Sequence, residues 1–296
     1  MKIKIPATTA NLGSGFDIMG VALNMYNYLE IKESNLTSLE IKNNTKGSIN
    51  LDKKDNLIYK SIKRVFDEFG EKIPELDMKM EVNIPLSRGL GSSSSAISAG
   101  VFAGNILLNK NLSKNDLVKI ATEIEGHPDN VAPCILGGIV LSLCEDKKVF
   151  TKKILSNLDL KFIVVVPEFE LSTEKARSVL PKKIVFADAV FNYSRRAFLV
   201  QGFYDNNIEM IKLGLDDKIH EQYRANLIEG FYAVKKAGLE SGAIGTVLSG
   251  AGPSILAITT KNEKEISENM VNKWSEFGIK SNANILSIDN EGILSI

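Results

Sequence analysis

Hydrophobic residues occupy every second position of the stretch LDMKMEVNI, from Leu76 to Ile84. A period of two predicts a β-strand with one buried face, which is typical of antiparallel sheets. The stretch YNYLEI at Tyr26–Ile31 shows a weaker form of the same alternation. Apolar runs and glycine turns predict further strands at 137–143 and 158–166, a hairpin at 242–258 and a short strand near the C-terminal end.

Apolar residues spaced three and four positions apart predict helices in other parts of the chain. In NLIYKSIKRVFDEF, at 56–69, they fall on one face of a helix. A second such pattern covers 113–125, where Ser113 is a candidate N-cap with Asp116 three residues later. The glycines and prolines of 126–136 are expected to end this helix and to leave an irregular segment. Further helices are predicted at 185–201, 223–237 and 263–277.

The predicted strands and helices alternate irregularly rather than as uniform βαβ units, which favours an α+β fold over a doubly wound parallel sheet. The 296 residues are enough for two modest domains. We place the boundary near residue 150, which gives an N-terminal domain at 1–150 and a C-terminal domain at 151–296. No proline- or serine-rich linker marks this boundary, and no internal repeat is present.

Composition excludes several classes of function. Lysine plus arginine and aspartate plus glutamate both number 36, so we expect binding to neither nucleic acid nor an anionic membrane. The two cysteines, Cys134 and Cys144, have no CxxC or Cys/His cluster around them, which argues against a zinc site or a disulfide framework. No window approaches the roughly 18 apolar residues of a membrane span. No apolar run of a signal peptide follows the first lysines, so we expect a cytoplasmic protein.

The stretch PLSRGLGSSSSAISAG, at 85–100, is consistent with a flexible linker, a serine nucleophile or a phosphate-binding loop. An alternating strand precedes it, and the apolar anchors of AISAGVFAGNILL indicate a helix after it. A strand, a glycine turn and a helix N-terminus form an anion-binding arrangement, because unpaired backbone N–H groups converge there. The serines at 92–95 are candidates to cap the helix or to bind a magnesium ion.

Three familiar motifs do not match this stretch. The GxxxxGK[ST] loop requires a lysine after its second glycine, and GxGxxG requires a glycine where this chain has Ser94. GxSxG requires a serine between two glycines, and none is present at that spacing. The stretch therefore predicts a phosphate-binding loop of another design.

This loop resembles the central motif of the GHMP kinases, a family that includes galactokinase, homoserine kinase, mevalonate kinase and phosphomevalonate kinase. PATTANLGSGFD at 6–17 is similar to the N-terminal motif of the family, and VLSGAGPSILAI at 247–258 to its C-terminal glycine motif. The resemblance implies a two-domain α+β fold with ATP and substrate bound between the domains. Within the family, EGHPDNVAP, STEKAR and YRANLIEG resemble the members that phosphorylate L-homoserine.

The resemblance also implies a substrate site. Homoserine is a zwitterion with a terminal hydroxyl, and guanidinium groups bind carboxylates in a two-pronged geometry. Positions similar to those of the family assign the carboxylate to Arg177 and Arg224, with His127 beside them, and the ammonium group to Asn11 and Asp17. The remaining substrate-site residues are Thr173, which also binds substrate, and Asn130 and Asp129, which lie at the reacting hydroxyl.

For the nucleotide, the resemblance implies the backbone and side chains of Pro85, Leu86, Ser87, Arg88, Gly89, Leu90, Gly91, Ser92, Ser93, Ser94 and Ser95. Asn56 matches a position near the adenine. Magnesium is expected on Glu125 and on Ser92 or Ser93, and Glu123 is the competing carboxylate. His220, Arg195 and Arg196 match no family position and are interpreted as structural.

We therefore expect an ATP- and Mg²⁺-dependent kinase that converts L-homoserine to O-phospho-L-homoserine in threonine biosynthesis. Phosphoryl transfer depends mainly on positioning and charge neutralisation, so little or no general-base catalysis is expected, with Asp129 as the candidate if a base is used. One alternative is another GHMP small-molecule kinase, of the mevalonate or shikimate type. A second is a non-catalytic binding module. The resemblance also suggests a homodimer.

Overall fold

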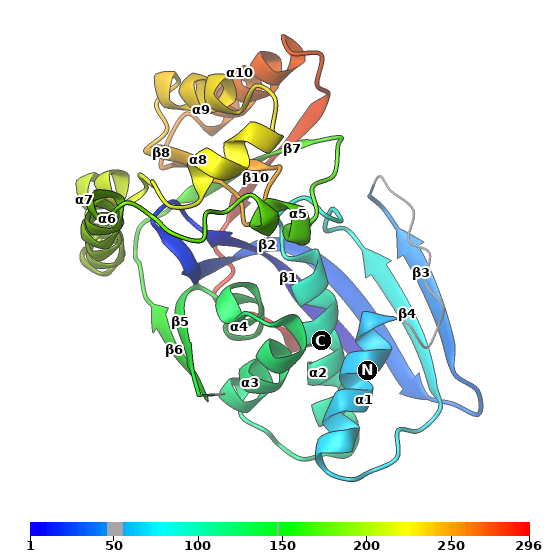
Figure 1. Cartoon of the computed structure of the whole chain (residues 1–296). Helices are drawn as coiled ribbons and strands as arrows, with labels where there is room; N and C mark the ends of the chain where they lie inside the picture. Colours follow the sequence, from blue (N-terminus) through cyan, green and yellow to red (C-terminus); the bar gives the residue numbers. More distant parts are fainter. Residues whose placement is uncertain (46–55, 147) are drawn as a thin grey trace.

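The computed structural model describes residues 1–45, 56–146 and 148–296, which form two β-sheets and their covering helices (Figure 1). The larger sheet has the strand order β11-β1-β2-β4-β3. In addition, β5 pairs with β2, and β6 pairs with β5. All its pairs are antiparallel except β3 with β4. Its strands are β1 (Lys2–Asn11), β2 (Gly15–Glu33), β3 (Ser38–Asn43), β4 (Leu76–Val82), β5 (Ile139–Glu145), β6 (Lys148–Ile154) and β11 (Leu294–Ser295).

Strand β2 organises this sheet because its length of 19 residues lets it pair with three neighbours. Its second half pairs with β4, its first half pairs with β5, and β1 runs along both. At the opposite side of β1, Ile3 faces Ser295 of β11. The last strand therefore returns to the first sheet, and both termini lie together.

Four helices pack against the larger sheet, in the lower half of Figure 1. Apolar residues of the sheet and of these helices form one buried cluster, which includes Ile5, Leu29, Ile62, Met78 and Val131. The helices are α1 (Leu57–Glu68), α2 (Ser92–Leu108), α3 (Lys114–Glu125) and α4 (Pro128–Leu136). Alternate residues of β4 face this cluster, which confirms that the hydrophobic positions of the period-two pattern form the buried face of the strand.

The second sheet is antiparallel, with the order β10-β7-β9-β8, and α9 and α10 cover it in the upper part of Figure 1. Its strands are β7 (Lys161–Pro167), β8 (Gly245–Leu248), β9 (Ile255–Thr259) and β10 (Ser281–Ser287). The helices of this half are α5 (Thr173–Ser178), α6 (Phe186–Asp205), α7 (Ile208–Gly214), α8 (Glu221–Arg224), a 3₁₀ turn at Ala225–Leu227, α9 (Phe231–Glu240) and α10 (Glu263–Ser275).

A further buried cluster joins the two sheets. It combines Leu12 and Val21 of the first half with Phe162 and Phe203 of the second. Apolar surface shared in this way holds the two halves together at the place where the first glycine-rich turn meets α7. The described part of the chain has no helix long and apolar enough to cross a membrane.

Most elements expected from the sequence are present. The helix at 113–125 begins at Ser113 with a capping box, in which Ser113 and Asp116 bond reciprocally. The hairpin at 242–258 is β8 paired with β9. Residue 150 lies within β6, and the second sheet begins at Lys161. The domain limits at 1–150 and 151–296 stay a prediction.

Two expectations were wrong. The segment 126–136 is not irregular, because α4 occupies most of it with one proline at its start and Pro133 inside it. A proline is favoured in the first turn, and burial of neighbours such as Val131 offsets the single bond that Pro133 removes. The helix predicted at 223–237 is interrupted at Gly230, whose φ of 75° is left-handed. Strands β1 and β3 were not predicted.

Candidate active site

One cavity of about 470 Å³ lies where the two halves meet. Its wall is formed by the serine-rich loop and α2, the α3–α4 junction, the start of α5 and the 250–252 turn. Among the sequence-predicted residues that line it are Asn11, Asp17, Asn56, Leu86, Ser87, Arg88, Gly89, Gly91, Ser92, Ser93, Ser94, Ser95, Glu125, His127, Asp129, Asn130, Thr173, Arg177 and Arg224. Of the predicted residues, Pro85 and Leu90 are outside this described lining, and Leu90 is buried in the cluster that joins the sheets.

The serine-rich loop connects β4 to α2, and its two glycines both have left-handed backbone conformations. Gly89 approaches the carbonyl of Ser249 so closely that a Cβ atom would lie 2.0 Å from it. A Cβ at Gly91 would lie 2.0 Å from Thr8 Oγ1. The loop is therefore held between the two other glycine-rich motifs, with the N-terminus of α2 at the cavity.

The helix N-terminus remains available to a ligand. Gly91 is the N-cap of α2, and no described side chain caps this end with a hydrogen bond. The serines are thus not caps, which is one of the two roles that the sequence suggested for them. An uncapped N-terminus of a 17-residue helix presents free N–H groups and the positive end of the helix dipole.

Arg88 anchors the loop to the second sheet. Its guanidinium donates to the carbonyls of Pro167, at 2.9 Å, and of Glu168, at 2.5 Å, where β7 ends. The side chain is 6% exposed and also lies 3.3 Å from a carboxylate oxygen of Glu170. This engagement links the position of the loop to the second half of the molecule, and a contact of Arg88 with nucleotide stays a prediction.

Glu125 is the carboxylate that faces the serines. Its oxygens accept hydrogen bonds from Ser93 Oγ, at 2.9 Å, and from Ser94 Oγ, at 2.6 Å. The competing residue, Glu123, forms an ion pair with Arg64 Nη2 at 2.7 Å and does not belong to the described cavity lining. A hydroxyl beside a carboxylate is a fitting oxygen donor set for Mg²⁺, which commonly uses one or two carboxylates together with phosphate oxygens.

His127, Asp129 and Asn130 form a chain of polar contacts at the start of α4. His127 Nδ1 lies 2.5 Å from Asp129 Oδ1, and this hydrogen bond raises the pKa of His127 despite the opposing effect of burial. Asn130 Oδ1 accepts a hydrogen bond of 2.9 Å from Thr8 Oγ1. Asp129 is 2% exposed, so its carboxylate interacts with neighbouring protein groups rather than with solvent.

Asp17 and Arg177 bond to each other across the cavity. Arg177 donates to both carboxylate oxygens of Asp17, at 2.8 and 3.1 Å. This carboxylate raises the pKa of Arg177. The Asp17 backbone N–H donates to Asn11 Oδ1 at 3.0 Å, and Asn11 Nδ2 donates to the Gly250 carbonyl at 2.7 Å. The residues expected to bind the ammonium group and those expected to bind the carboxylate therefore lie together in one hydrogen-bonded group.

Arg224 lies beneath this pair and is 1% exposed. Its guanidinium donates to the carbonyls of Gly250, at 3.1 Å, and Ala176, at 3.2 Å. Burial, and next to it the positive charge of Arg177, lower the pKa of Arg224 to about 10. The ring of Phe16 lies 5.1 Å from Arg224 Cζ and 5.9 Å from Arg177 Cζ. Two cations facing one cavity favour an anionic ligand group.

The cavity also has an apolar part that sequence reasoning did not predict. It is lined by Ile41, Leu57, Ile58, Met80 and Val82, from β3, α1 and β4. Asn56 stands beside them and caps α1, because its Oδ1 accepts a hydrogen bond of 2.7 Å from the Ile58 N–H. Alternation and helix periodicity marked some of these residues as core, and only the fold turns them toward a cavity.

A second set of residues that was missed supports the loop from behind. Thr9 Oγ1 lies 2.9 Å from Ser249 Oγ, which in turn donates to the Gly89 carbonyl at 2.7 Å. Thr8 holds Asn130 in the same way. These residues lie within the N-terminal and C-terminal motifs that resemble the GHMP kinases. The match to those motifs was the sequence signal that could have identified these supporting residues.

Family models and individual relatives indicate the same protein family for this chain. The family model described as "GHMP kinases N terminal domain" matches residues 56–138, and "GHMP kinases C terminal" matches residues 196–280. A homoserine kinase of Halothermothrix orenii is 41% identical over 295 residues, covering 99% of this chain and 95% of that protein. A homoserine kinase of Desulfitobacterium hafniense is 41% identical over 293 residues, covering 99% and 98%.

Solved structures agree with this result. The crystal structure of homoserine kinase from Cytophaga hutchinsonii superimposes with a TM-score of 0.90 at 33% identity, covering 100% of this chain and 97% of the other. A mevalonate kinase from L. major, at 17% identity and a TM-score of 0.73, shares the fold alone. The two-domain α+β fold expected from the sequence is confirmed by these matches. The chain belongs to the GHMP kinase family, within the group of the homoserine kinases.

Proposed function

We propose that this protein transfers the γ-phosphoryl group of ATP to the hydroxyl of L-homoserine and releases O-phospho-L-homoserine and ADP. One observation carries the proposal. A single cavity combines an uncapped helix N-terminus and glycine loop with a cluster of Asp17, Arg177 and Arg224. The first feature suits phosphate groups, and the second suits a small molecule with both charges.

The Asp17–Arg177 pair supports recognition of an α-amino acid. Each group already satisfies the other, so a ligand that separates them must supply both an ammonium group and a carboxylate. Homoserine has both, and it would present its ammonium group to Asp17 and Asn11 and its carboxylate to Arg177 and Arg224. A neutral alcohol that separated this pair would leave both charges without a partner. Thr173, which lines the cavity at the start of α5, is proposed as a further substrate contact.

The phosphate groups are proposed to lie on the backbone of 85–95 at the start of α2. Ser93 and Glu125 would hold Mg²⁺, which neutralises phosphate charge when bound. The apolar part of the cavity around Met80 and Ile58 would receive the adenine, with Asn56 beside it. This arrangement uses positioning and electrostatics, which account for most of the rate in phosphoryl transfer.

The hydroxyl is proposed to lie at Asn130 and Asp129. An amide cannot accept a proton usefully, and the Asp129 carboxylate already accepts a hydrogen bond from His127. We therefore assign Asp129 to the orientation of His127 and of the hydroxyl, with little or no general-base catalysis. The product would enter threonine biosynthesis in the cytoplasm, and a homodimer stays a prediction that sedimentation analysis checks.

An ADP-release assay with homoserine, mevalonate, shikimate and galactose tests the function. Turnover is expected with homoserine and ATP, and it should depend on Mg²⁺. Preference for mevalonate or shikimate would replace the proposal with another GHMP kinase activity. Nucleotide binding without turnover of any of the four compounds would favour a non-catalytic module.

A further inference from the structure

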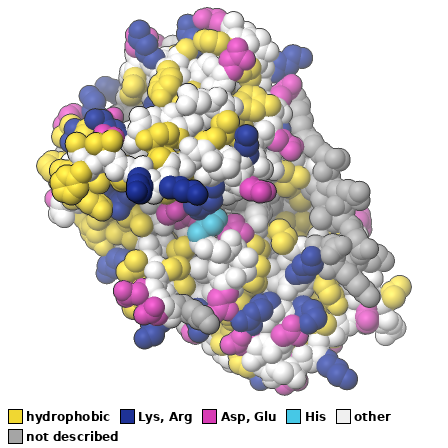
Figure 2. All heavy atoms as spheres, in the orientation of Figure 1, with side chains coloured by type: hydrophobic (Ala, Val, Ile, Leu, Met, Phe, Trp, Pro, Cys, Tyr) yellow, Lys and Arg dark blue, Asp and Glu magenta, His cyan; other side chains and the backbone are white. Residues whose placement is uncertain are grey.

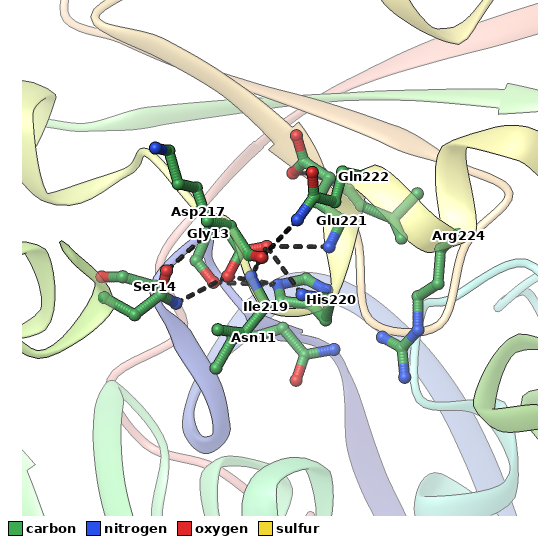
Figure 3. Close-up of polar contacts among 12 residues, drawn as sticks. Asn11, Gly13, Ser14, Asp217, Ile219, His220, Glu221, Gln222 and Arg224 are labelled. Atoms are coloured by element: carbon green, nitrogen blue, oxygen red, sulfur yellow. Dashed lines mark hydrogen bonds and ion pairs between the residues drawn. The ribbon is translucent and has the colours of Figure 1, made fainter. Parts of the chain in front are cut away.

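His220 is fully buried although no part of the proposed chemistry uses it. It precedes α8, the short helix that carries Arg224, and its side chain is 0% exposed. His220 Nε2 lies 2.9 Å from the carbonyl oxygen of Gly13, in the turn between β1 and β2 (Figure 3). Burial of an imidazole without solvent is costly, so the contacts that it makes need an explanation.

The turn that His220 contacts is held from several sides. Ser14 Oγ donates to the Gly214 carbonyl at 2.6 Å, and Arg196 Nε donates to the Ser14 carbonyl at 2.9 Å. A Cβ at Gly13 would lie 1.9 Å from the carbonyl oxygen of Leu215, so the turn is pressed against the end of α7. The turn is thus fixed to three elements of the second half of the molecule: α6, α7 and the segment before α8.

This turn connects directly to the charged part of the cavity. Its flanking residues Asn11 and Asp17 both line the cavity, and both have left-handed backbone conformations. The ring of His220 stacks on Phe16, with centroids 4.8 Å apart and an interplanar angle of 19°. Phe16 also contacts the guanidinium groups of Arg177 and Arg224. A movement of His220 would therefore move both halves of the zwitterion site.

The contacts of His220 also define its protonation state. A carbonyl oxygen only accepts, so Nε2 must carry the proton, while the buried Nδ1 has no hydrogen-bond partner among the described residues. A second proton on Nδ1 would place a buried N–H donor without an acceptor. The imidazole is therefore neutral, and burial, the largest cause, lowers the pKa of His220.

Charged groups around His220 come from the segment before α8, from α8 itself and from four further elements. Asp217 Oδ1 lies 3.7 Å from Nε2, but this carboxylate already accepts hydrogen bonds from Asn192 and from the backbone at 219–221. Glu221, the next residue, pairs with Lys235 of α9. The other charges are Arg224 of α8, Arg177 of α5, Arg196 of α6, and Asp17 of β2 beside the turn. The two carboxylates nearest in sequence are thus engaged elsewhere.

We propose that His220 is a positioning residue for homoserine: as a neutral imidazole it fixes the turn between β1 and β2 together with Phe16 at the start of β2, and through them Asp17, Arg177 and Arg224. The proposal rests on the proposed function, because it concerns the homoserine end of the cavity. It predicts that substitutions at His220 change the KM for homoserine and leave the KM for ATP unchanged, because the loop proposed to bind ATP leads into α2.

Steady-state kinetics of two complementary variants test this role. His220→Phe keeps a ring against Phe16 and removes the donor to Gly13, and His220→Gln keeps a donor and removes the ring. We expect His220→Phe to raise the KM for homoserine roughly tenfold, the equilibrium equivalent of one hydrogen bond, with the KM for ATP unchanged. His220→Gln should restore part of this loss. Equal changes in both KM values, or a lower melting temperature with neither KM changed, would overturn the proposal.

Phe203→Leu is the matched control, since Phe203 is also fully buried, in the cluster that joins the sheets. It should lower the melting temperature and leave both KM values unchanged. Nitrogen-15 NMR of the wild-type protein gives a readout that is independent of activity. The chain has only 2 histidines, so His127→Asn assigns both.

In this experiment His220 should show the Nε2–H tautomer without titration between about pH 5 and 8. An Nδ1–H or doubly protonated His220 would contradict the proposal even if homoserine is not the substrate. If wild-type protein fails to phosphorylate homoserine while His220 shows the expected tautomer, the proposed function is the part that fails.

Discussion

Replacement of Gly91 by alanine tests the phosphate loop most directly. Gly91 has φ 68°, and an added Cβ would lie 2.0 Å from Thr8 Oγ1 and 3.2 Å from Asn130 Oδ1. A Cβ atom essentially never lies within 3.0 Å of such a neighbour, so the loop or Thr8 must move. Alanine in a left-handed conformation costs about 1 kcal/mol, and loss of the Thr8–Asn130 hydrogen bond costs about 1 kcal/mol more.

Gly70 provides a matched control for this substitution. It has φ 67°, and an added Cβ would meet no atom within 4 Å. Gly70→Ala should therefore show only the backbone cost, about 1 kcal/mol in the free energy of unfolding. Gly91→Ala should lose about 2 kcal/mol in chemical denaturation. Its kcat should fall on the order of 100-fold, because the loop proposed to hold the phosphates would be displaced by an ångström or more.

The comparison of the two variants decides the outcome. Adding Thr8→Ala to Gly91→Ala removes the obstructing oxygen and should recover part of the lost stability. If Gly91→Ala and Gly70→Ala lose the same free energy of unfolding, and kcat is unchanged in both, then the loop tolerates the added atom. The tight contact between the two motifs would then have no role in catalysis.

Four further predictions concern the charged residues of the cavity. Arg177→Met should raise the KM for homoserine at least tenfold and spare the KM for ATP, while Arg64→Met on the surface should change neither. Glu125→Gln should raise the Mg²⁺ concentration required for half-maximal turnover, as measured by titration with the metal. Asp129→Asn should keep a kcat within about tenfold of wild type, since a loss near 1,000-fold would indicate a general base. Asp129 raises the pKa of His127 above 6.5, and His127 favours the homoserine carboxylate while it is protonated. The KM for homoserine should therefore rise as the pH increases through this raised pKa. In Asp129→Asn the same rise in KM should occur at lower pH, because the pKa of His127 is no longer raised by the carboxylate.

Local features of the chain could be predicted from the sequence. The alternating strand at 76–82, the two glycines and the start of α2 are contiguous, so their conformations depend mainly on neighbouring residues. The capping box at Ser113 is local in the same sense. The helix at 128–136 was missed because its internal proline is unfavourable locally, and only burial between the sheet and its neighbouring helices compensates.

The candidate site illustrates the same division. Resemblance of motifs named its residues, yet it could not decide between Glu123 and Glu125. Two positions apart on a helix differ by about 200°, so the packing of α3 determines which carboxylate faces the serines. The sequence likewise contains no sign that Asp17 and Arg177, which are 160 positions apart, bond to each other. Nor does it indicate that His220 supports them from behind.

The sequence by itself indicated the family, predicted a phosphate-binding loop and supplied the residue types suited to phosphate and to a zwitterion. The tertiary structure alone decided which of those groups meet, which are buried and which neighbours alter their pKa values. The physical reason is range: backbone propensities and caps act within a few residues, whereas hydrogen bonds, ion pairs and desolvation depend on distances of a few ångströms between segments far apart in the chain.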